Sequence, residues 1–256
     1  MREFNYPDGE QNVYSRYSGD GGVPVGLPLQ RLLAAAYLME PRLLFDGSLS
    51  QDSRLLLRRQ VQKRLQAIAP FLTFESQPYL VTVRVPTADG YRSEQHQYWL
   101  LDGFTSSRSY PYSAANPSGI RYFRNPVKAV VDALNGRVWI YVMDPNDPVL
   151  RTWRNAFPEM FRSLDAMPLA IRDHLLVPKT QFQVQAERLL RFHVTDVRSF
   201  YNGDDVWAIP KEIYGSKQVD VRPYHVTLQL PGKDTPEFVL LLPFTPLRRP
   251  DRKSTR

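Results

Sequence analysis

The sequence predicts an α+β fold with a mainly antiparallel β-sheet, a central hairpin and helices packed against that sheet. Two β-rich runs, residues 127–133 and 137–143, flank a Leu134-Asn135-Gly136 corner, where Asn and Gly tolerate the positive φ of tight turns. Further β-rich runs lie before and after this hairpin, and other stretches have apolar residues at helical spacing. We expect the strands to pair antiparallel and the helices to cover the sheet.

The composition is that of a folded domain. The chain has 256 residues, 43% of them hydrophobic, and can bury a substantial core. It has no cysteine, which excludes disulfides, thiolate metal sites and a cysteine nucleophile. Its longest apolar runs reach only about ten residues, against about 20 for a membrane helix, so we expect no bilayer span. No apolar signal region follows Met1, which predicts either a cytosolic protein or a part of a longer one.

The net charge of +7 and the pI near 9.6 raise the question of a nucleic-acid partner. Residues 248–256 hold five basic residues and one acidic residue, a net +4, which leaves +3 for the other 247 residues. These terminal residues have no apolar period and are predicted to form a flexible basic tail. More than half of the net charge therefore lies in the tail, which weakens the argument for a nucleic-acid partner; the family resemblance described below implies that there is no nucleic-acid partner.

Residues 1–27 are polar and rich in Gly and Pro, and predict an extended arm. The glycines at 19–22 resemble a phosphate-binding loop only superficially, because no Gly-Lys-Ser/Thr follows them. Residues 28–39 then predict a core helix ended by Pro41, with its apolar residues at helical spacing. These apolar residues are Leu29, Leu32, Leu33 and Ala36.

A second helix is predicted from a cap at Ser50 or Asp52 to about residue 69. Its apolar face consists of Leu57, Val61, Leu65 and Ile68. Its basic residues are Arg54, Arg58, Arg59, Lys63 and Arg64. At 100° per residue these five scatter around the helix, which favours a solvated surface with snorkelling side chains over a contact with an anionic surface. Any binding of the chain to anionic vesicles, through the basic tail and this helix, is predicted to be weak and screened by salt.

Residues 78–85 and 97–101 predict a second hairpin with its turn around Asp89-Gly90. The polar stretch that follows, from Asp102 to Gly119, predicts a long loop of the kind that often carries function. We select eight candidate ligand-binding residues in and beside this loop: Trp99, Asp102, Arg108, Tyr110, Tyr112, Arg121, Tyr122 and Arg124. The aromatic rings could stack on a sugar while the arginines bind an acidic group. The same rings could instead pack the loop onto its own sheet, which is the simpler interpretation.

The run 137–143 is apolar on both faces, so we expect a central strand with Val138, Ile140 and Val142 buried. After it, Asp147 is predicted to cap a helix that begins at Pro148. Asp132 and Asp144 could join Asp147 as oxygen ligands of a hard cation. Turn formation and capping explain these carboxylates without an ion, and we predict no metal site.

The last third of the chain predicts two helices, 165–176 and 179–192, separated by Pro178. His193 falls on the apolar face of the second helix, which favours a buried neutral imidazole over a catalytic or metal role. Thr195 is expected to cap a short turn that Asn202-Gly203 reverses. Residues 224–230 and 237–244 then predict an antiparallel strand pair.

No catalytic constellation emerges from the sequence. It has no Gly-x-Ser-x-Gly elbow, no His pair at metal-ligand spacing and no dinucleotide fingerprint. We therefore predict no catalytic residue, no metal and no cofactor, and expect binding rather than turnover.

Several long segments, in order from residue 5 to 247, resemble the UPF0182 family of uncharacterised bacterial membrane proteins. They include "NVYSRYSGDGGVPVG", "RRQVQKRLQAIAPFL", "YWLLDGFTSSRSYPYS", "GIRYFRNPVKAVVDALNGRVWIYVMDPNDPVLRTWRNAFP", "RFHVTDVRSFYNGDDVWAIP" and "LQLPGKDTPEFVLLLPFTP". Members of that family have several N-terminal transmembrane helices followed by a large extracytoplasmic region. The resemblance implies that residues 28–247 form an extracytoplasmic α+β domain, as one unit or two closely packed subdomains.

The resemblance also implies a location at the cell membrane, on its extracytoplasmic side, with the upstream membrane helices and the downstream sequence as partners. It transfers no catalytic residue, because the family has none established. We therefore expect a binding or structural module of the cell envelope whose ligand is an envelope glycan or an anionic lipid. The alternative is an envelope enzyme that acts on a glycan or a lipid, which would need an acid and a base in one cleft.

Overall fold

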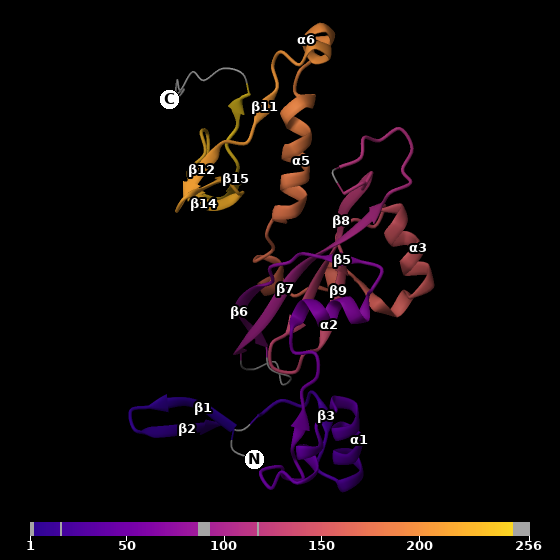
Figure 1. Cartoon of the computed structure of the whole chain (residues 1–256), viewed down its shortest axis with the longest axis vertical. Helices are drawn as coiled ribbons and strands as arrows, with labels where there is room; N and C mark the ends of the chain where they lie inside the picture. Colours follow the sequence, from indigo (N-terminus) through magenta and orange to yellow (C-terminus); the bar gives the residue numbers. More distant parts are fainter. Residues whose placement is uncertain (1–2, 16, 87–92, 117, 248–256) are drawn as a thin grey trace. The chain divides into compact units, whose positions relative to one another are not determined.

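The computed structural model describes residues 3–15, 17–86, 93–116 and 118–247 (Figure 1). It divides into two compact units, Met1–Leu175 and Leu176–Arg256, and each is considered by itself. The boundary falls inside the stretch 28–247 that was expected to hold one domain or two subdomains. The predicted Asp89-Gly90 turn and the basic tail lie outside the described residues. The fold class is α+β with mostly antiparallel sheets, as predicted.

The first unit is built on a six-stranded sheet in the order β10-β9-β8-β7-β5, with β6 also paired to β7. Its strands are β5 Thr73–Phe74, β6 Tyr79–Pro86, β7 Ser93–Ser107, β8 Tyr122–Asp132, β9 Val138–Val142 and β10 Phe161–Ser163. All pairs are antiparallel except β9 with β10. The predicted central hairpin is β8–β9. Ile140 and Val142 on β9 are buried as expected, whereas Val138 is only partly buried. Both predicted hairpins are therefore confirmed.

Helices cover both faces of this sheet. On one face α2, Val61–Ile68, places Leu65 against Leu101 and Val127, and α3, Pro148–Ala156, adds Leu150. On the other face α4, Leu169–Arg172, places Ile171 beside Val130 and Tyr141. Val127, Ala129 and Val131 of β8 face the first core and Val130 faces the second, so residues 126–132 are buried without interruption even though they include Lys128 and Asp132.

The predicted helix 50–69 is wrong in its first half. Residues Arg54–Leu55 form β4 and pair with β3, Val23–Pro24, and Arg58 has a positive φ of 52°. The helix begins only at Val61. Arg64 holds the preceding loop, because its guanidinium donates to the carbonyls of Leu57 and Gly136 at 2.8 and 3.0 Å. Strand pairing and this bonding outweigh the helical spacing of residues 50–60.

The glycine-rich stretch packs against the turn of the central hairpin. The Tyr17 hydroxyl donates to the Leu134 carbonyl at 3.0 Å, and the Asp20 amide donates to Asn135 Oδ1 at 2.9 Å. A Cβ on Gly21 would collide with the Asn135 backbone carbonyl, so the close approach requires glycine there. These glycines therefore serve the fold. Before them, β1 Glu3–Asp8 and β2 Gln11–Ser15 form a hairpin within the predicted arm.

The predicted core helix is present as α1, Pro28–Leu38, followed by the 3₁₀ turn η1, Pro41–Leu44. Its placement in the core is wrong. Only Ala35 of this helix is buried, while Leu29 and Leu33 are 66% and 63% exposed. Helical periodicity identified the helix but not what covers its apolar face.

Two further boundaries differ from the sequence analysis. Strand β7 continues past Leu101 to Ser107, with a register irregularity between Gly103 and Thr105. The predicted helix 165–176 is split into a 3₁₀ turn, Leu164–Ala166, and the short α4, because Pro168 lacks the amide that a continuous helix needs.

The second unit contains α5, Lys179–Phe192, with the predicted bounds, and α6, Val197–Asn202, which is capped by Asp196 rather than Thr195. Its strand pairs are β11 Trp207–Ala208 with β16 Thr245–Pro246, β12 Lys211–Tyr214 with β13 Lys217–Asp220, and the predicted pair β14 Tyr224–Leu228 with β15 Glu237–Leu241. The His193 ring stacks on Trp207 with centroids 3.7 Å apart. Within the described residues, no helix combines the length and apolar character that crossing a bilayer requires.

Candidate functional site

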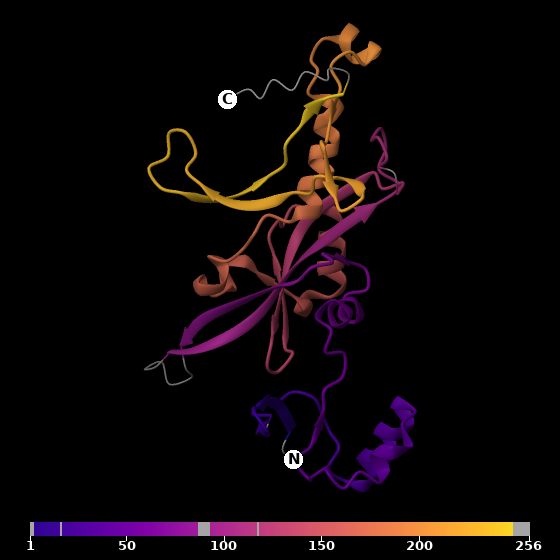
Figure 2. The same ribbon diagram turned by 60° about the vertical axis from the view of Figure 1, so that its left-hand side comes forward.

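The candidate site lies at the end of the β7–β8 hairpin, which projects beyond the rest of the sheet in Figures 1 and 2. The connection between the two strands, residues 108–121, contains Tyr110. The Tyr110 ring stacks on that of Tyr122, the first residue of β8, with ring centroids 5.4 Å apart. The Arg124 guanidinium carbon lies 5.6 Å from the Tyr122 ring centroid, a cation–π distance. Three of the eight predicted residues therefore form one stack.

Asp147 holds Tyr122 of this stack in place by a hydrogen bond. It caps α3, and its Oδ1 accepts from the Leu150 amide at 2.6 Å. Its Oδ2 accepts from the hydroxyls of Thr105, at 3.0 Å, and Tyr122. The carboxylate is 2% exposed. Its charge is thus committed to a helix end and two hydroxyls, and the Tyr122 ring is held in one position.

The Tyr122 phenol remains neutral over a wide pH range. Burial raises its pKa, and the hydrogen bond to Asp147 and the charge of that carboxylate raise it further. The nearby Arg124 charge only partly opposes these effects. The stack therefore presents aromatic rings and guanidinium groups, with no phenolate charge at neutral pH.

The connection that carries Tyr110 is held by its own hydrogen bonds. Arg121 donates from its guanidinium to the Ser113 carbonyl, and the Ser113 hydroxyl donates to the Arg121 carbonyl at 2.7 Å. Asn116 Oδ1 accepts from the amides of Ser118 and Ile120, at 3.0 and 2.9 Å. Arg121 therefore combines a structural role with an exposed position beside the stack.

Two more predicted residues are open to solvent on the same connection. Arg108 is exposed and makes no hydrogen bond or ion pair within the described part of the chain. Tyr112 is fully exposed and has a positive φ of 54°. From residue 103 to 131 the sequence contains arginine and lysine but no Asp or Glu. The hairpin end is therefore uniformly basic.

Asp102 does not belong to this cluster. It is buried and pairs with Lys128, its direct neighbour on β8. Burial raises the pKa of Asp102, and the Lys128 charge acts in the opposite direction. The same cross-strand row continues through Tyr141 on β9 to Arg162 on β10. Asp102 is thus part of a polar row inside the sheet.

Trp99 also lies away from the stack. It packs against the core that contains Leu65 and lines a cleft of about 880 Å³ beside α2 and the central hairpin turn. Ser107 lies eight positions further along β7, which corresponds to roughly 26 Å along a strand. The eight predicted residues therefore divide into six at the hairpin end and two elsewhere.

The three carboxylates considered for a cation do not converge. Asp132 lies at the β8–β9 turn, where it accepts from the amides of Leu134 and Asn135 at 2.7 and 2.9 Å. Asp144 and Asp147 follow the opposite end of β9. In the described ranges no group of three His, Cys, Asp or Glu residues could hold a metal ion. The cation interpretation of these three residues is wrong, because hairpin geometry separates them.

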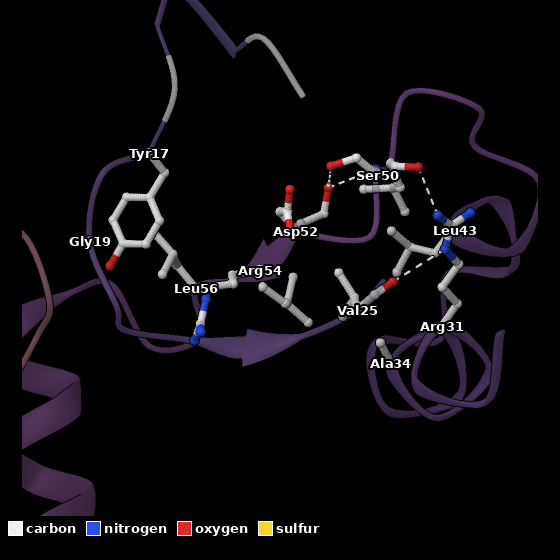
Figure 3. Close-up of a pocket in the computed structure, with 13 residues that line it drawn as sticks. Tyr17, Gly19, Val25, Arg31, Ala34, Leu43, Ser50, Asp52, Arg54 and Leu56 are labelled. Atoms are coloured by element: carbon white, nitrogen blue, oxygen red, sulfur yellow. Dashed lines mark hydrogen bonds between the residues drawn. The ribbon is translucent and has the colours of Figure 1, made fainter. Parts of the chain in front are cut away.

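A second cavity, of about 400 Å³, lies between α1 and the loop 49–56 (Figure 3). Arg31 and Arg54 line it, but both donate to backbone carbonyls. Arg31 bonds to Val25 and Leu49 at 3.2 and 2.7 Å, and Arg54 bonds to Asp20 at 3.0 Å. Both guanidinium groups therefore stabilise the protein's own backbone. At the hairpin end, in contrast, Arg108 makes no hydrogen bond or ion pair in the described part of the chain.

Thr105 and Asp147 were not among the predicted site residues. Asp147 was recognised as a helix cap, and its position before Pro148 carried no sign of its contact with Tyr122. Thr105 fell in the expected loop, whereas it lies on the extended β7. Only the pairing of β7 with β8 brings these residues together.

Comparison with known proteins identifies one family. Residues 1–253 match the model of "Uncharacterised protein family (UPF0182)". A UPF0182 protein of Prochlorococcus marinus (strain MIT 9303) is 53% identical over 254 residues, which cover 98% of this chain and 27% of the relative. One from Nostoc sp. (strain PCC 7120) is 45% identical over 249 residues, 97% of this chain and 25% of the relative.

The chain thus spans about a quarter of the length of these curated relatives. No solved structure gives a significant match. On the family match and on these identities, the chain belongs to the UPF0182 family.

Proposed function

We propose that the chain is an extracytoplasmic binding module of a membrane protein, and that the end of its β7–β8 hairpin binds an anionic group of the cell envelope. The observation that carries this proposal is the Tyr110–Tyr122–Arg124 stack beside Arg108 and Arg121. The ligand chemistry is a phosphate or carboxylate next to a sugar or glycerol face. A lipid headgroup and an acidic glycan both offer it.

Charge supports an anionic ligand. Asp147, the carboxylate bonded to the stack, is buried and already accepts three hydrogen bonds. Asp144 is exposed and its charge also acts on Tyr122, but in the described residues it forms no ion pair with Arg108, Arg121 or Arg124. Arg108 has no partner in the described residues, and a guanidinium presents a fork of donors that matches phosphate and carboxylate oxygens. An incoming anion would therefore find cations without having to displace an acid.

The aromatic rings support a ligand with a flat or weakly polar face. Tyr110 is half exposed, and its stacking on Tyr122 fixes one of its faces while the other remains open. Rings that are already stacked lose little side-chain entropy when a ligand binds. Sugar rings and glycerol backbones both suit such a surface.

The location and the partners are part of the proposal. The resemblance to a membrane family implies upstream transmembrane helices and further downstream sequence, and the relatives are about four times as long as the matched stretch. We propose that these segments are the partners of this chain. The bilayer would then lie within reach of a basic surface, which favours electrostatic contact with anionic headgroups.

The test is a titration of the chain, ending at Leu247 to remove the basic tail, against two pairs of probes. Phosphatidylcholine vesicles with and without phosphatidylglycerol report a lipid ligand, and polygalacturonate against neutral dextran reports an acidic glycan. Arg108→Gln and Arg124→Gln should each weaken binding to the preferred anionic probe about fivefold, because each arginine near an anionic surface contributes about 1 kcal/mol. Tyr110→Ala should weaken it further.

Arg84→Gln is the matched control, since Arg84 is an exposed arginine on the edge strand β6 of the same unit. It should leave affinity unchanged. Binding that is equally insensitive to the changes at Arg108, Arg124 and Tyr110 would refute the hairpin site. Chemical conversion of the glycan or the lipid would instead favour the alternative of an envelope enzyme.

A further inference from the structure

Helix α1 carries an apolar face that no described residue of its own unit covers. Leu29, Leu32, Leu33, Ala36 and Tyr37 lie within about 140° of its circumference. All five are exposed, and Tyr37 is 63% exposed. A helix stripe of this width is normally the surface that faces a core. Here it faces outwards.

The polar side of the same helix faces inwards. Arg31, the only charged residue of α1, points from the helix towards the opposing loop (Figure 3). Its guanidinium donates to the carbonyls of Val25 and Leu49 at 3.2 and 2.7 Å. The inward orientation is thus fixed by hydrogen bonds to the chain's own backbone, and the outward orientation of the leucines follows from it.

The apolar surface continues beyond the end of the helix. Met39, in the left-handed C-cap position, is 89% exposed, and Phe45, which ends η1, is 87% exposed. The charged residues around them are Glu40, Arg42 and Asp46. The patch therefore has an uncharged centre, and the three charged residues next to its end in the sequence sum to −1.

We infer that this face of α1 is the docking surface for an apolar helix of the same, longer polypeptide, from sequence outside this chain. The inference rests on the proposal that the chain is one part of a longer membrane protein. The matched stretch makes up 27% of the Prochlorococcus marinus relative, so most of such a polypeptide lies outside it. A tethered segment meets the patch at high effective concentration, which favours it over a separate partner.

The shape and the charge of the patch distinguish this occupant from a lipid surface. The small side chain of Ala36 lies between those of Leu32 and Leu33, at i–4 and i–3, on the helix surface. It leaves a shallow groove into which a side chain of another helix can pack. The only cation of α1, Arg31, is bonded to the chain's own backbone, so the helix lacks the basic side of a typical interfacial helix. Docking on the bilayer and pairing of two copies therefore become outcomes of the test.

The absence of native cysteine in the chain permits a direct measurement. We would place Leu33→Cys or the control Thr82→Cys, an exposed position on β6 and off the patch, in two proteins. One is the isolated chain. The other is a chimera in which this chain replaces the matching 254 residues of the Prochlorococcus marinus relative. Maleimide labelling of each site is followed by mass spectrometry of its peptide.

Both sites should react at similar rates in the isolated chain. In the chimera the rate at position 33 should fall about tenfold or more, in proportion to the fraction of time the patch is open, while the rate at position 82 is unchanged. Equal rates in the chimera would overturn the inference. So would protection of the isolated chain by vesicles, which indicates a bilayer, or concentration-dependent protection together with a dimer mass, which indicates a second copy. Loss of anion binding at the hairpin end would change none of these rates.

Discussion

The six-stranded sheet and helix α1 use similar residues in opposite ways. In the sheet, Val127, Val130 and Ile140 are almost completely buried, and even the charges of Asp102 and Lys128 are paired inside. In α1, leucines of the same hydrophobicity face outwards and the one arginine faces inwards. The sheet is completed by its own chain, whereas α1 presents an interface. An apolar pattern thus identifies a surface to be covered but not the segment that covers it.

The second unit resembles α1 in this respect. Among its described residues, prolines aside, the buried aliphatic and aromatic side chains are Ala186 and Leu242. Phe192, Val197 and Tyr201 on α5 and α6 are all more than half exposed. We therefore expect the stability of the chain to be concentrated in the sheet. The following substitutions test this contrast.

The largest effect is expected from Lys128→Met. This change leaves the Asp102 carboxylate buried without its partner, which typically costs about 3–5 kcal/mol. Urea melts followed by tryptophan fluorescence should record the loss. The double variant Asp102→Leu, Lys128→Met should recover most of it, because an apolar pair of similar volume is often tolerated. If the double variant is as unstable as the single one, the pair is required for packing rather than for charge compensation.

The next effect is expected from Ile140→Ala. Ile140 is 1% exposed and packs in the core with Leu101 and Ala129, so truncation leaves a cavity and should cost about 2–5 kcal/mol. The same urea melts measure it. A loss below about 1 kcal/mol would mean that the sheet collapses around the gap, and would weaken the contrast with α1.

The sequence predicted the sheet better than the surroundings of the sheet. The Leu134-Asn135-Gly136 turn and the two-sided apolar run around Ile140 are local signals, and both appear in the structure. The pairing of Arg54 with Pro24 is not local, and it replaced the first half of a predicted helix. Periodicity reports which residues share a face, but long-range pairing decides whether the backbone becomes helix or strand.

The candidate site shows the same division. Tyr110, Tyr122 and Arg124 could be grouped from the sequence because they flank one connection, and the structure places them in one stack. Asp102 was grouped with them because β7 was expected to end at Leu101. The strand continues, and the alternation of its side chains carries Asp102 into the sheet. The supporting contact of Asp147 depends on a helix that lies 25 residues further along the chain.

A smaller effect, dependent on pH, is expected at Asp132. Burial raises the pKa of this carboxyl, but hydrogen bonds from the Asn135 and Leu134 amides and from His96 outweigh burial and lower it. Because the pKa of Asp132 is lower in the folded state, its ionised form stabilises the fold at pH values above the unfolded-state pKa of about 3.9. This stabilisation is lost as the pH falls from there through the folded-state pKa. Asp132→Asn should cost about 1–3 kcal/mol at pH 7. Its stability should then fall less steeply than that of the wild type below about pH 4. Equal slopes would assign the acid sensitivity to other groups.

The smallest effect is expected from Leu33→Gln, and it bears most directly on the contrast between α1 and the sheet. Gln and Leu have similar helix propensities, so the substitution changes the apolar face of α1 and little else. Because Leu33 is 63% exposed, its side chain gains little from folding of the isolated chain, and urea melts should shift by less than about 0.5 kcal/mol. Ile140→Ala, measured in parallel, shows what a covered residue costs. A loss above about 1 kcal/mol for Leu33→Gln would mean that the chain itself covers this face in solution. The open face of α1, and the interface inferred from it, would then have to be abandoned.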